Sequence, residues 1–104
     1  MLNRVTLMGK LCDNPELKKT ADGTSVMSFT LANKTYGDKV NYIDCVAWRE
    51  TAEQIARYRK DNLLVVEGYL QNRSYTKKDG TQRTITELVV CREYFGTEAL
   101  YEYN

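Results

Sequence analysis

The chain has 104 residues, enough for one domain with a single hydrophobic core and too few for two. Its 15 Lys and Arg nearly balance its 14 Asp and Glu, and the formal net charge of +1 by itself indicates no polyanionic partner. Because it has no histidine and only three widely spaced cysteines, the sequence predicts neither a Cys/His zinc site nor a disulfide framework, and it is typical of a reduced intracellular protein. Arg4 and Lys10 interrupt the N-terminal apolar run, so neither a signal segment nor a membrane span is predicted.

The hydropathy pattern predicts five strands and one short helix. Apolar side chains recur at every second position of the strands, and the period changes to that of a helix in one segment. The strands are expected over residues 3–11, 25–33, 40–48, 62–76 and 82–95, and the helix over residues 50–60. Tight turns are expected at Asp22-Gly23, Gly37-Asp38 and Asp79-Gly80. Residues 12–24 are expected to form a loop in which Lys18 and Lys19 are solvated, and Thr51 with Gln54 is expected to cap the helix.

This order of elements favours a closed barrel. Five strands satisfy their edges by closing on themselves, whereas a sandwich of two sheets would need more strands. The expected fold is therefore all-β: a five-stranded barrel of the oligonucleotide-binding (OB) type, formed by residues 1–104 as one domain. One short helix is expected between the third and fourth strands, and the fourth and fifth strands form a long hairpin.

The aromatic residues are the strongest functional signal. Eight Tyr and one Trp stand against two Phe, so nearly every ring has a polar group, which suits a wet surface. Strict alternation in the third strand places Tyr42, Asp44, Val46 and Trp48 on one side, and Ile43, Cys45 and Ala47 on the other. The second set is small and apolar and is expected in the core. Trp48 and Tyr42 are then expected outside, as a platform on which nucleobases stack.

The fourth strand repeats this pattern. Its core phase is expected to hold Val66, Gly68 and Leu70, and its outer phase Tyr69, Gln71, Arg73 and Tyr75. The hairpin beyond adds Lys77, Lys78 and Arg83, so residues 73–83 have four positive charges and one negative charge. Interleaved rings and cations suit a groove for a flexible single strand, because the cations neutralise phosphates and each ring accepts any base.

Structural and catalytic interpretations compete with this one. Outward tyrosines are common on sheets because of cross-strand packing alone, and a structural role is expected for Tyr58, Tyr94, Tyr101 and Tyr103. Asp44 and Glu67 are the one candidate pair of catalytic carboxylates, but charged residues on a barrel surface are the favoured interpretation. Neither a GxSxG motif nor a Gly-rich phosphate loop is present, so we expect no enzyme, no cofactor and no metal site.

The chain also resembles a known family along almost its whole length. The segments that carry the resemblance are MLNRVTLMGKL, NPELKKTADGTSVMSFTLA, DCVAWRETAE and VEGYLQNRSYTKKDGTQR. In order and spacing they are similar to the bacterial-type single-stranded DNA-binding proteins. The resemblance implies an OB-fold barrel that binds and protects single-stranded DNA during replication, recombination or repair, with little sequence preference and no catalysis. It also implies a homo-oligomer, usually a homotetramer, in the bacterial cytoplasm or nucleoid.

Individual positions carry the resemblance further. The rings that match base-stacking positions of the family are Trp48, Tyr75, Tyr42 and Tyr36, and the cations that match its phosphate contacts are Arg4, Lys10 and Arg73. Lys77 and Lys78 belong to a generally basic hairpin, and the strand pattern adds Tyr69. Asp44 and Glu50 depart from the family, which often has basic residues there, and this implies weaker or more salt-sensitive binding.

The remaining expectations concern partners, the subunit contact and alternative functions. Family members usually continue through a Gly/Pro/Gln-rich segment to an acidic tip that recruits repair and replication enzymes, whereas this chain ends in YEYN. As a shortened or naturally tailless form, it is expected not to recruit them. Met8 and Thr6, outward and uncharged, are the candidates for a subunit contact. The alternative functions are an RNA-binding barrel of the cold-shock kind and a protein-interaction module of a replication or conjugation complex.

Overall fold

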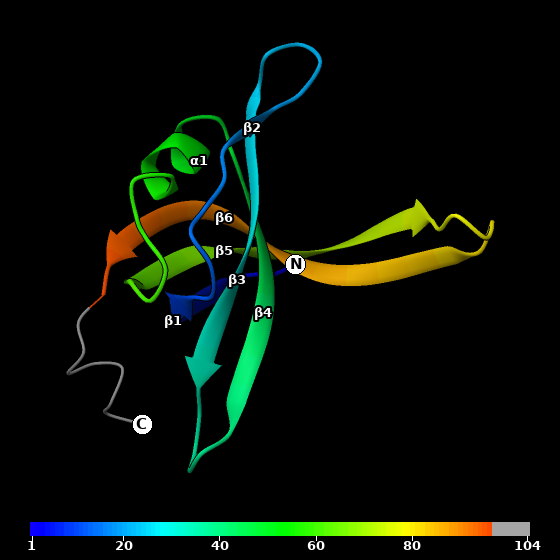
Figure 1. The fold of residues 1–104 in the computed structure, drawn as a ribbon. Helices are drawn as coiled ribbons and strands as arrows, with labels where there is room; N and C mark the ends of the chain where they lie inside the picture. The colour runs from blue at the N-terminus through cyan, green and yellow to red at the C-terminus, as the bar shows by residue number, and fades with distance from the viewer. Residues whose placement is uncertain (97–104) are drawn as a thin grey trace.

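Five long strands and one helix follow one another in the predicted order within residues 1–96, the part of the chain that this computed structural model describes (Figure 1). The strands are β1 (Val5–Leu11), β2 (Lys18–Lys19), β3 (Ser25–Lys34), β4 (Val40–Trp48), β5 (Leu63–Thr76) and β6 (Gln82–Phe95), and the helix is α1 (Arg49–Ile55). The five long strands are the five predicted ones. Tyr101 and Tyr103 lie outside the described residues.

The five long strands close into a barrel. β1 pairs with β5, β5 with β6, β6 with β4 and β4 with β3, and β3 returns to β1 through the pairs Lys10–Ala32 and Leu11–Leu31. The pairing of β4 with β6 is parallel, and the other four are antiparallel. The predicted OB-type barrel, with its helix between the third and fourth long strands, is confirmed.

The inner sides of these strands form the core. In β4, Cys45 and Ala47 are buried and Ile43 packs against the same cluster, as the alternation predicted. Ala52 and Ile55 of α1 are buried against this cluster as well, so the helix covers one end of the barrel (Figure 1).

The short strand β2 corrects the predicted loop over 12–24. Lys18 pairs with Val26 and Lys19 with Ser25, so β2 and the start of β3 form a small hairpin. The turn at Asp22-Gly23, which the sequence predicted, reverses the chain and brings these residues opposite one another. Lys18 and Lys19 are exposed, but they are strand residues and not loop residues.

The helix is shorter than predicted. It ends at Ile55, and the chain then turns through Asp61, whose φ of 71° lies in the left-handed region, to enter β5. Thr51 does not cap the helix, because the chain passes from β4 directly into α1 and Trp48 takes the N-cap position without a side-chain cap. Within residues 1–96, no helix is long and apolar enough to cross a membrane.

The β5–β6 pair extends beyond the barrel as a two-stranded arm (Figure 1). A β-bulge interrupts its register at Glu67 and Gly68, where Cys91 is the extra residue on β6. β5 leaves the barrel wall here, because its pairing with β1 ends at Gly68, whereas β6 stays in the wall through Val89 and Leu88, which pair with β4. Leu70, predicted in the core, is therefore 43% exposed.

Val46 is a second correction. The alternation placed it outside with Asp44 and Trp48, yet only 5% of it is exposed. The parallel pairing of β4 with β6 sets Val46 beside the buried Val89, which in turn pairs with Tyr69 of β5. The side chains of Val46, Val89 and Tyr69 thus form an apolar strip on the outer side of the barrel.

Candidate nucleic-acid interface

Trp48 stands at one end of the outer side of β3 and β4. Its cross-strand partner on β3 is Val26, and the partner of Val26 on β2 is Lys18. Directly opposed residues of antiparallel strands point to the same side with their Cβ atoms about 4.5–5.5 Å apart. Trp48, Val26 and Lys18 therefore form one row, here called the Trp48 row, in which a ring 41% exposed and a lysine flank an aliphatic side chain.

Tyr42 begins a second row of the same kind. It pairs with Ala32 of β3, and Ala32 pairs with Lys10 of β1. Tyr42 is 69% exposed. This Tyr42 row lies about 20 Å from the Trp48 row, because six residues of extended strand separate the two rings. Each end of the face therefore presents a ring with a lysine two strands away.

An acidic cleft of about 550 Å³ lies near the middle of the same face. Its charged lining residues are Asp13, Glu16, Asp44, Arg73 and Glu87. Thr30 Oγ1 donates to Asp44 Oδ1 across the strand pair at 3.4 Å. Because carboxylates outnumber the single guanidinium here, the cleft repels phosphate, in contrast to the two rows at the ends of the face.

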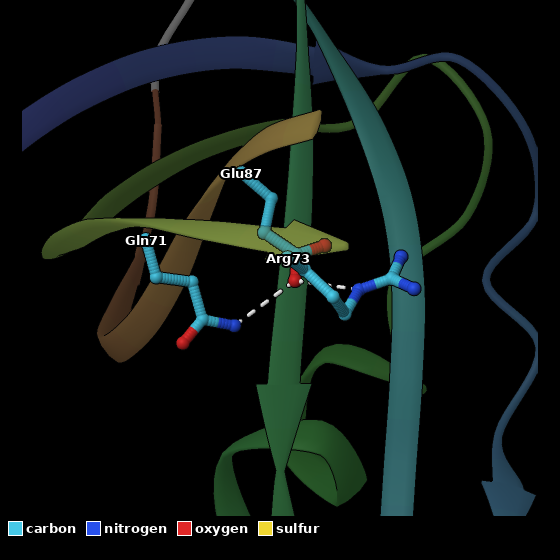
Figure 2. A network of polar contacts seen from close by, with 3 residues as sticks. All are labelled: Gln71, Arg73 and Glu87. Carbon is cyan, nitrogen blue, oxygen red and sulfur yellow. Dashed lines mark hydrogen bonds and ion pairs between the residues drawn. The ribbon is translucent and has the colours of Figure 1, made fainter. Parts of the chain in front are cut away.

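Glu87 is a buried carboxylate in the lining of this cleft (Figure 2). Its Oε1 accepts hydrogen bonds from Gln71 Nε2 at 2.9 Å and from Arg73 Nε at 3.0 Å. A buried carboxylate is costly unless it is paired and hydrogen-bonded, so these two donors from β5 are needed where the arm leaves the barrel. Arg73, predicted as a phosphate contact, thus has part of its charge offset by Glu87, while half of its side chain stays exposed.

The arm holds the third predicted ring. Tyr75 pairs with Arg83 across the strands, and the guanidinium carbon of Arg73 lies 5.9 Å from the centroid of the Tyr75 ring. Lys77 and Lys78 are exposed in the turn at the tip. Tyr75 thus lies next to Arg73 and opposite Arg83, with Lys77 and Lys78 beyond it on the arm.

Tyr36, Arg4 and Tyr69 lie apart from the two rows. Tyr36 is 92% exposed in the turn between β3 and β4, beyond the Tyr42 end of the face. Arg4 lines a separate recess of about 370 Å³ with Glu67 and Tyr69. Tyr69 is also joined to the outer side of β4, because it pairs with Val89, and Val89 pairs with Val46, two residues before Trp48. Glu67 and Asp44 line different hollows, which removes the candidate carboxylate pair.

The cysteine beside the cleft, Cys45, belongs to the buried core. Burial, followed by the nearby carboxylates of Asp44 and Glu87, raises the pKa of the Cys45 thiol to about 12. The thiolate is the reactive form, so a thiol with this pKa is inert at neutral pH. Within residues 1–96, no three His, Cys, Asp or Glu side chains are grouped as a metal site requires.

Two residues at the Trp48 end of the face, Lys18 and Arg49, were not predicted from the sequence. Lys18 joins the Trp48 row only because β2 pairs with β3, and the Asp22-Gly23 turn, which implies such a pairing, was the available signal. Arg49 follows Trp48 with a φ of 54°, in the left-handed region that residues with a side chain rarely adopt. Such backbone strain clusters at functional sites, and no local sequence signal predicts it.

Comparisons with known proteins agree with this geometry. A sequence model described as the single-strand binding protein family matches residues 2–95. The single-stranded DNA-binding protein of Enterococcus faecalis is 43% identical over 101 residues, which cover 90% of this chain and 53% of that protein. That of Halalkalibacterium halodurans is 41% identical over 96 residues, covering 86% of this chain and 57% of that protein.

The fold agrees as well. The crystal structure of a deletion variant of the single-stranded DNA-binding protein from Thermus aquaticus superposes with a TM-score of 0.77 at 32% identity, covering 93% of this chain and 42% of that one. The chain spans about half the length of the curated relatives it matches. Since the family model covers nearly all the described residues, the chain belongs to the single-strand binding protein family.

Proposed function

We propose that this chain binds single-stranded DNA on the outer side of β3 and β4, with little sequence preference and without catalysis. The observation that carries the proposal is the pair of rows, in which Trp48 and Tyr42 each share a row with a lysine. A ring accepts the face of any base, at about 1–3 kcal/mol per stacked base, and a lysine neutralises phosphate. Duplex DNA keeps its base faces stacked on one another, so the rows favour an unpaired strand.

The charge pattern suggests how the strand lies. The exposed carboxylate of Asp44 repels phosphates near the middle of the face, so we expect the backbone to follow the lysines of the two rows while base edges face the cleft. Tyr75 on the arm offers a further ring, and Lys77 and Lys78 offer further phosphate contacts. Arg4, Tyr36 and Tyr69 belong to the proposal as outlying contacts.

The cellular role follows from the family. We propose that residues 1–104 act as one OB-fold domain that protects single strands during DNA replication, recombination or repair, in the bacterial cytoplasm or nucleoid. The match to the family and the names of the relatives support this role.

We also propose that the chain acts as a homotetramer. Among the described residues, Val5–Leu7 pair with β5 on one side only, because β3 joins β1 just at Lys10 and Leu11. An unpaired strand edge is a template for another chain. Thr6 is exposed there and Met8 is half-buried. Met8→Glu is expected to lower the mass measured by light scattering, and an unchanged tetramer mass would remove Met8 from the contact.

The test of DNA binding is a titration with oligo-thymidine followed by the fluorescence of Trp48, the sole tryptophan. Strong quenching is expected, with an affinity that falls with salt at a slope of roughly −0.7 per neutralised phosphate. Trp48→Ala, followed by the anisotropy of a labelled strand, is expected to weaken binding by about 1–3 kcal/mol. Duplex of equal length is the control, and RNA of equal length tests the RNA-binding alternative. Absence of both quenching and anisotropy change at low salt would refute the proposal.

A further inference from the structure

A hollow of about 590 Å³ lies beside Trp48 where β4 meets α1. The residues that line it are Thr20, Ala21, Asp22, Thr24, Trp48 and Arg49. The first four belong to the turn between β2 and β3, and the other two belong to the junction between β4 and α1. The hollow therefore has two walls from separate segments, and the partly exposed ring of Trp48 belongs to one of them.

Three polar side chains connect these two walls. Lys19 Nζ donates to Ser25 Oγ at 2.8 Å, and Ser25 Oγ donates to Glu53 Oε2 at 2.8 Å. Lys19 and Ser25 flank the turn, while Glu53 lies in α1, one helical turn after Arg49. Ser25 is only 3% exposed, so its hydroxyl depends on these partners for its hydrogen bonds. Lys19, Ser25 and Glu53 are here called the Ser25 relay.

The turn between β2 and β3 is closed by hydrogen bonds among its own residues. Thr20 N donates to Thr24 O at 2.9 Å, Gly23 N donates to Thr20 O at 2.9 Å, and Thr24 N donates to Asp22 Oδ1 at 3.2 Å. Because these bonds fix its shape internally, the position of the turn relative to Trp48 is decided at its base. The Ser25 relay is located at that base.

The lining suits a flat ring with polar edges. Trp48 offers an aromatic face and Thr24 a hydroxyl group, and the positive charge of Arg49 is accompanied by the carboxylate of Asp22, which accepts from the Thr20 hydroxyl. Arg49 holds its left-handed φ of 54° although glycine would adopt it more readily. A nucleobase has the required flat faces and polar edge, and its phosphate has the charge that an arginine pairs with.

We propose that Ser25, through Lys19 and Glu53, is a positioning residue for single-strand binding, which holds the 20–24 turn opposite Trp48 so that one unpaired base is enclosed between them. The inference rests on the proposed binding of single-stranded DNA. It assigns the relay a task beyond stability: without it the fold persists, but the turn moves away from Trp48 and the base loses one wall.

The test compares two carboxylates of α1. Glu53→Ala breaks the relay, whereas Glu50→Ala removes the same charge one turn earlier on the same helix without touching Ser25. Each variant loses one negative charge, which by itself favours binding of a polyanion. We expect Glu50→Ala to bind oligo-thymidine as tightly as the parent or more tightly, and Glu53→Ala to bind about fivefold more weakly through loss of part of one stacking contact. Glu53→Gln keeps an acceptor for Ser25 and is expected to restore binding.

A second readout does not depend on DNA. In the free protein, acrylamide is expected to quench Trp48 more strongly in Glu53→Ala than in Glu50→Ala, because the turn no longer shields the ring. Lys19→Met, at an exposed position, breaks the relay from its other end and is expected to show the same increase even if Glu53→Ala unfolds.

The outcomes separate the two proposals. Equal acrylamide quenching in the folded Glu53→Ala, Lys19→Met and Glu50→Ala proteins would overturn the positioning role while leaving DNA binding intact. If the parent protein bound no oligo-thymidine, the proposed function would fail, and the acrylamide result would still report whether the relay places the turn.

Discussion

β5 and β6 form one continuous antiparallel pair, yet its two halves differ in kind. In the barrel half, Leu64, Val66 and Leu88 are fully buried. In the arm, every residue from 72 to 84 is exposed, although the cross-strand pairs continue without interruption to Thr76 and Gln82. Strand pairing is the same in both halves, so closure of the barrel and not pairing decides which residues are buried. The arm is free to present Tyr75 and its cations because it contributes nothing to the core.

The largest test of this comparison is at the junction. A Cβ atom added to Gly68 would lie 1.8 Å from the carbonyl oxygen of Val89, which is backbone and has no room to move without breaking the bulge. Gly68→Ala is therefore expected to destabilise the protein by about 3 kcal/mol or more, measured by urea unfolding.

Gly80 at the tip of the arm is the control for Gly68. Its φ of 88° is strained for alanine, but a Cβ atom there meets nothing within 4 Å. Gly80→Ala is expected to cost about 1 kcal/mol. Equal losses in the two variants would mean that the bulge is not the point where the arm is fixed to the barrel.

The next test uses a single cross-strand pair. Leu70 and Leu88 are direct partners, but Leu88 is fully buried and Leu70 is 43% exposed. Leu88→Ala is expected to lower the free energy of unfolding by about 2–5 kcal/mol, because it leaves a cavity in the core. Leu70→Ala is expected to cost less than about 1 kcal/mol. A similar loss in both variants would show that Leu70 is buried in solution, for example by another subunit.

Much of this fold was predictable because its signals are local. Alternation along 40–48 and the Asp-Gly turns set the long strands and their inner and outer sides. The exposure of Leu70 was not predictable, because it depends on where the pairing of β5 with β1 ends, which is at Gly68. β2 was missed because two residues carry no periodicity, and only their pairing with Val26 and Ser25 makes them a strand.

For the candidate site, the alternation of side chains along residues 40–48 predicted that Trp48 and Tyr42 lie on the outer side of the sheet, and the structure has them there. Their role in binding stays a prediction. Their row partners Lys18 and Lys10 depend on register across three strands, which one strand's sequence does not determine. The pairing of Glu87 with Arg73 likewise joins residues 14 positions apart, through the register of the arm.

The smallest expected effect distinguishes the turn beside Trp48 from the turn at the tip of the arm. Both contain Asp-Gly-Thr, and both share one backbone pattern: Lys77 N donates to Thr81 O at 2.8 Å, as Thr20 N does to Thr24 O at 2.9 Å. The two turns differ in which threonine donates to the aspartate. Beside Trp48 it is Thr20, two residues before Asp22, whereas in the arm it is Thr81, two residues after Asp79, whose Oγ1 donates to Asp79 Oδ1 at 2.6 Å.

These hydrogen bonds lower the pKa of both carboxyl groups below the ordinary value of 3.8, led by Thr20 at Asp22 and by Thr81 at Asp79. A carboxyl group whose folded pKa is depressed stabilises the fold above its unfolded pKa, and this contribution is lost as the pH falls through the folded value. Asp22→Asn and Asp79→Asn are therefore expected to be less stable than the parent at pH 7, and the difference is expected to shrink below about pH 3.8.

Urea unfolding from pH 7 to pH 3 measures the Asp22 difference. Amide exchange in the arm measures that of Asp79, because the arm can open without the barrel. If the difference between Asp22→Asn and the parent did not change with pH, the charge of Asp22 would not be what stabilises the turn, and the wall opposite Trp48 would depend on the backbone hydrogen bonds and the Ser25 relay alone.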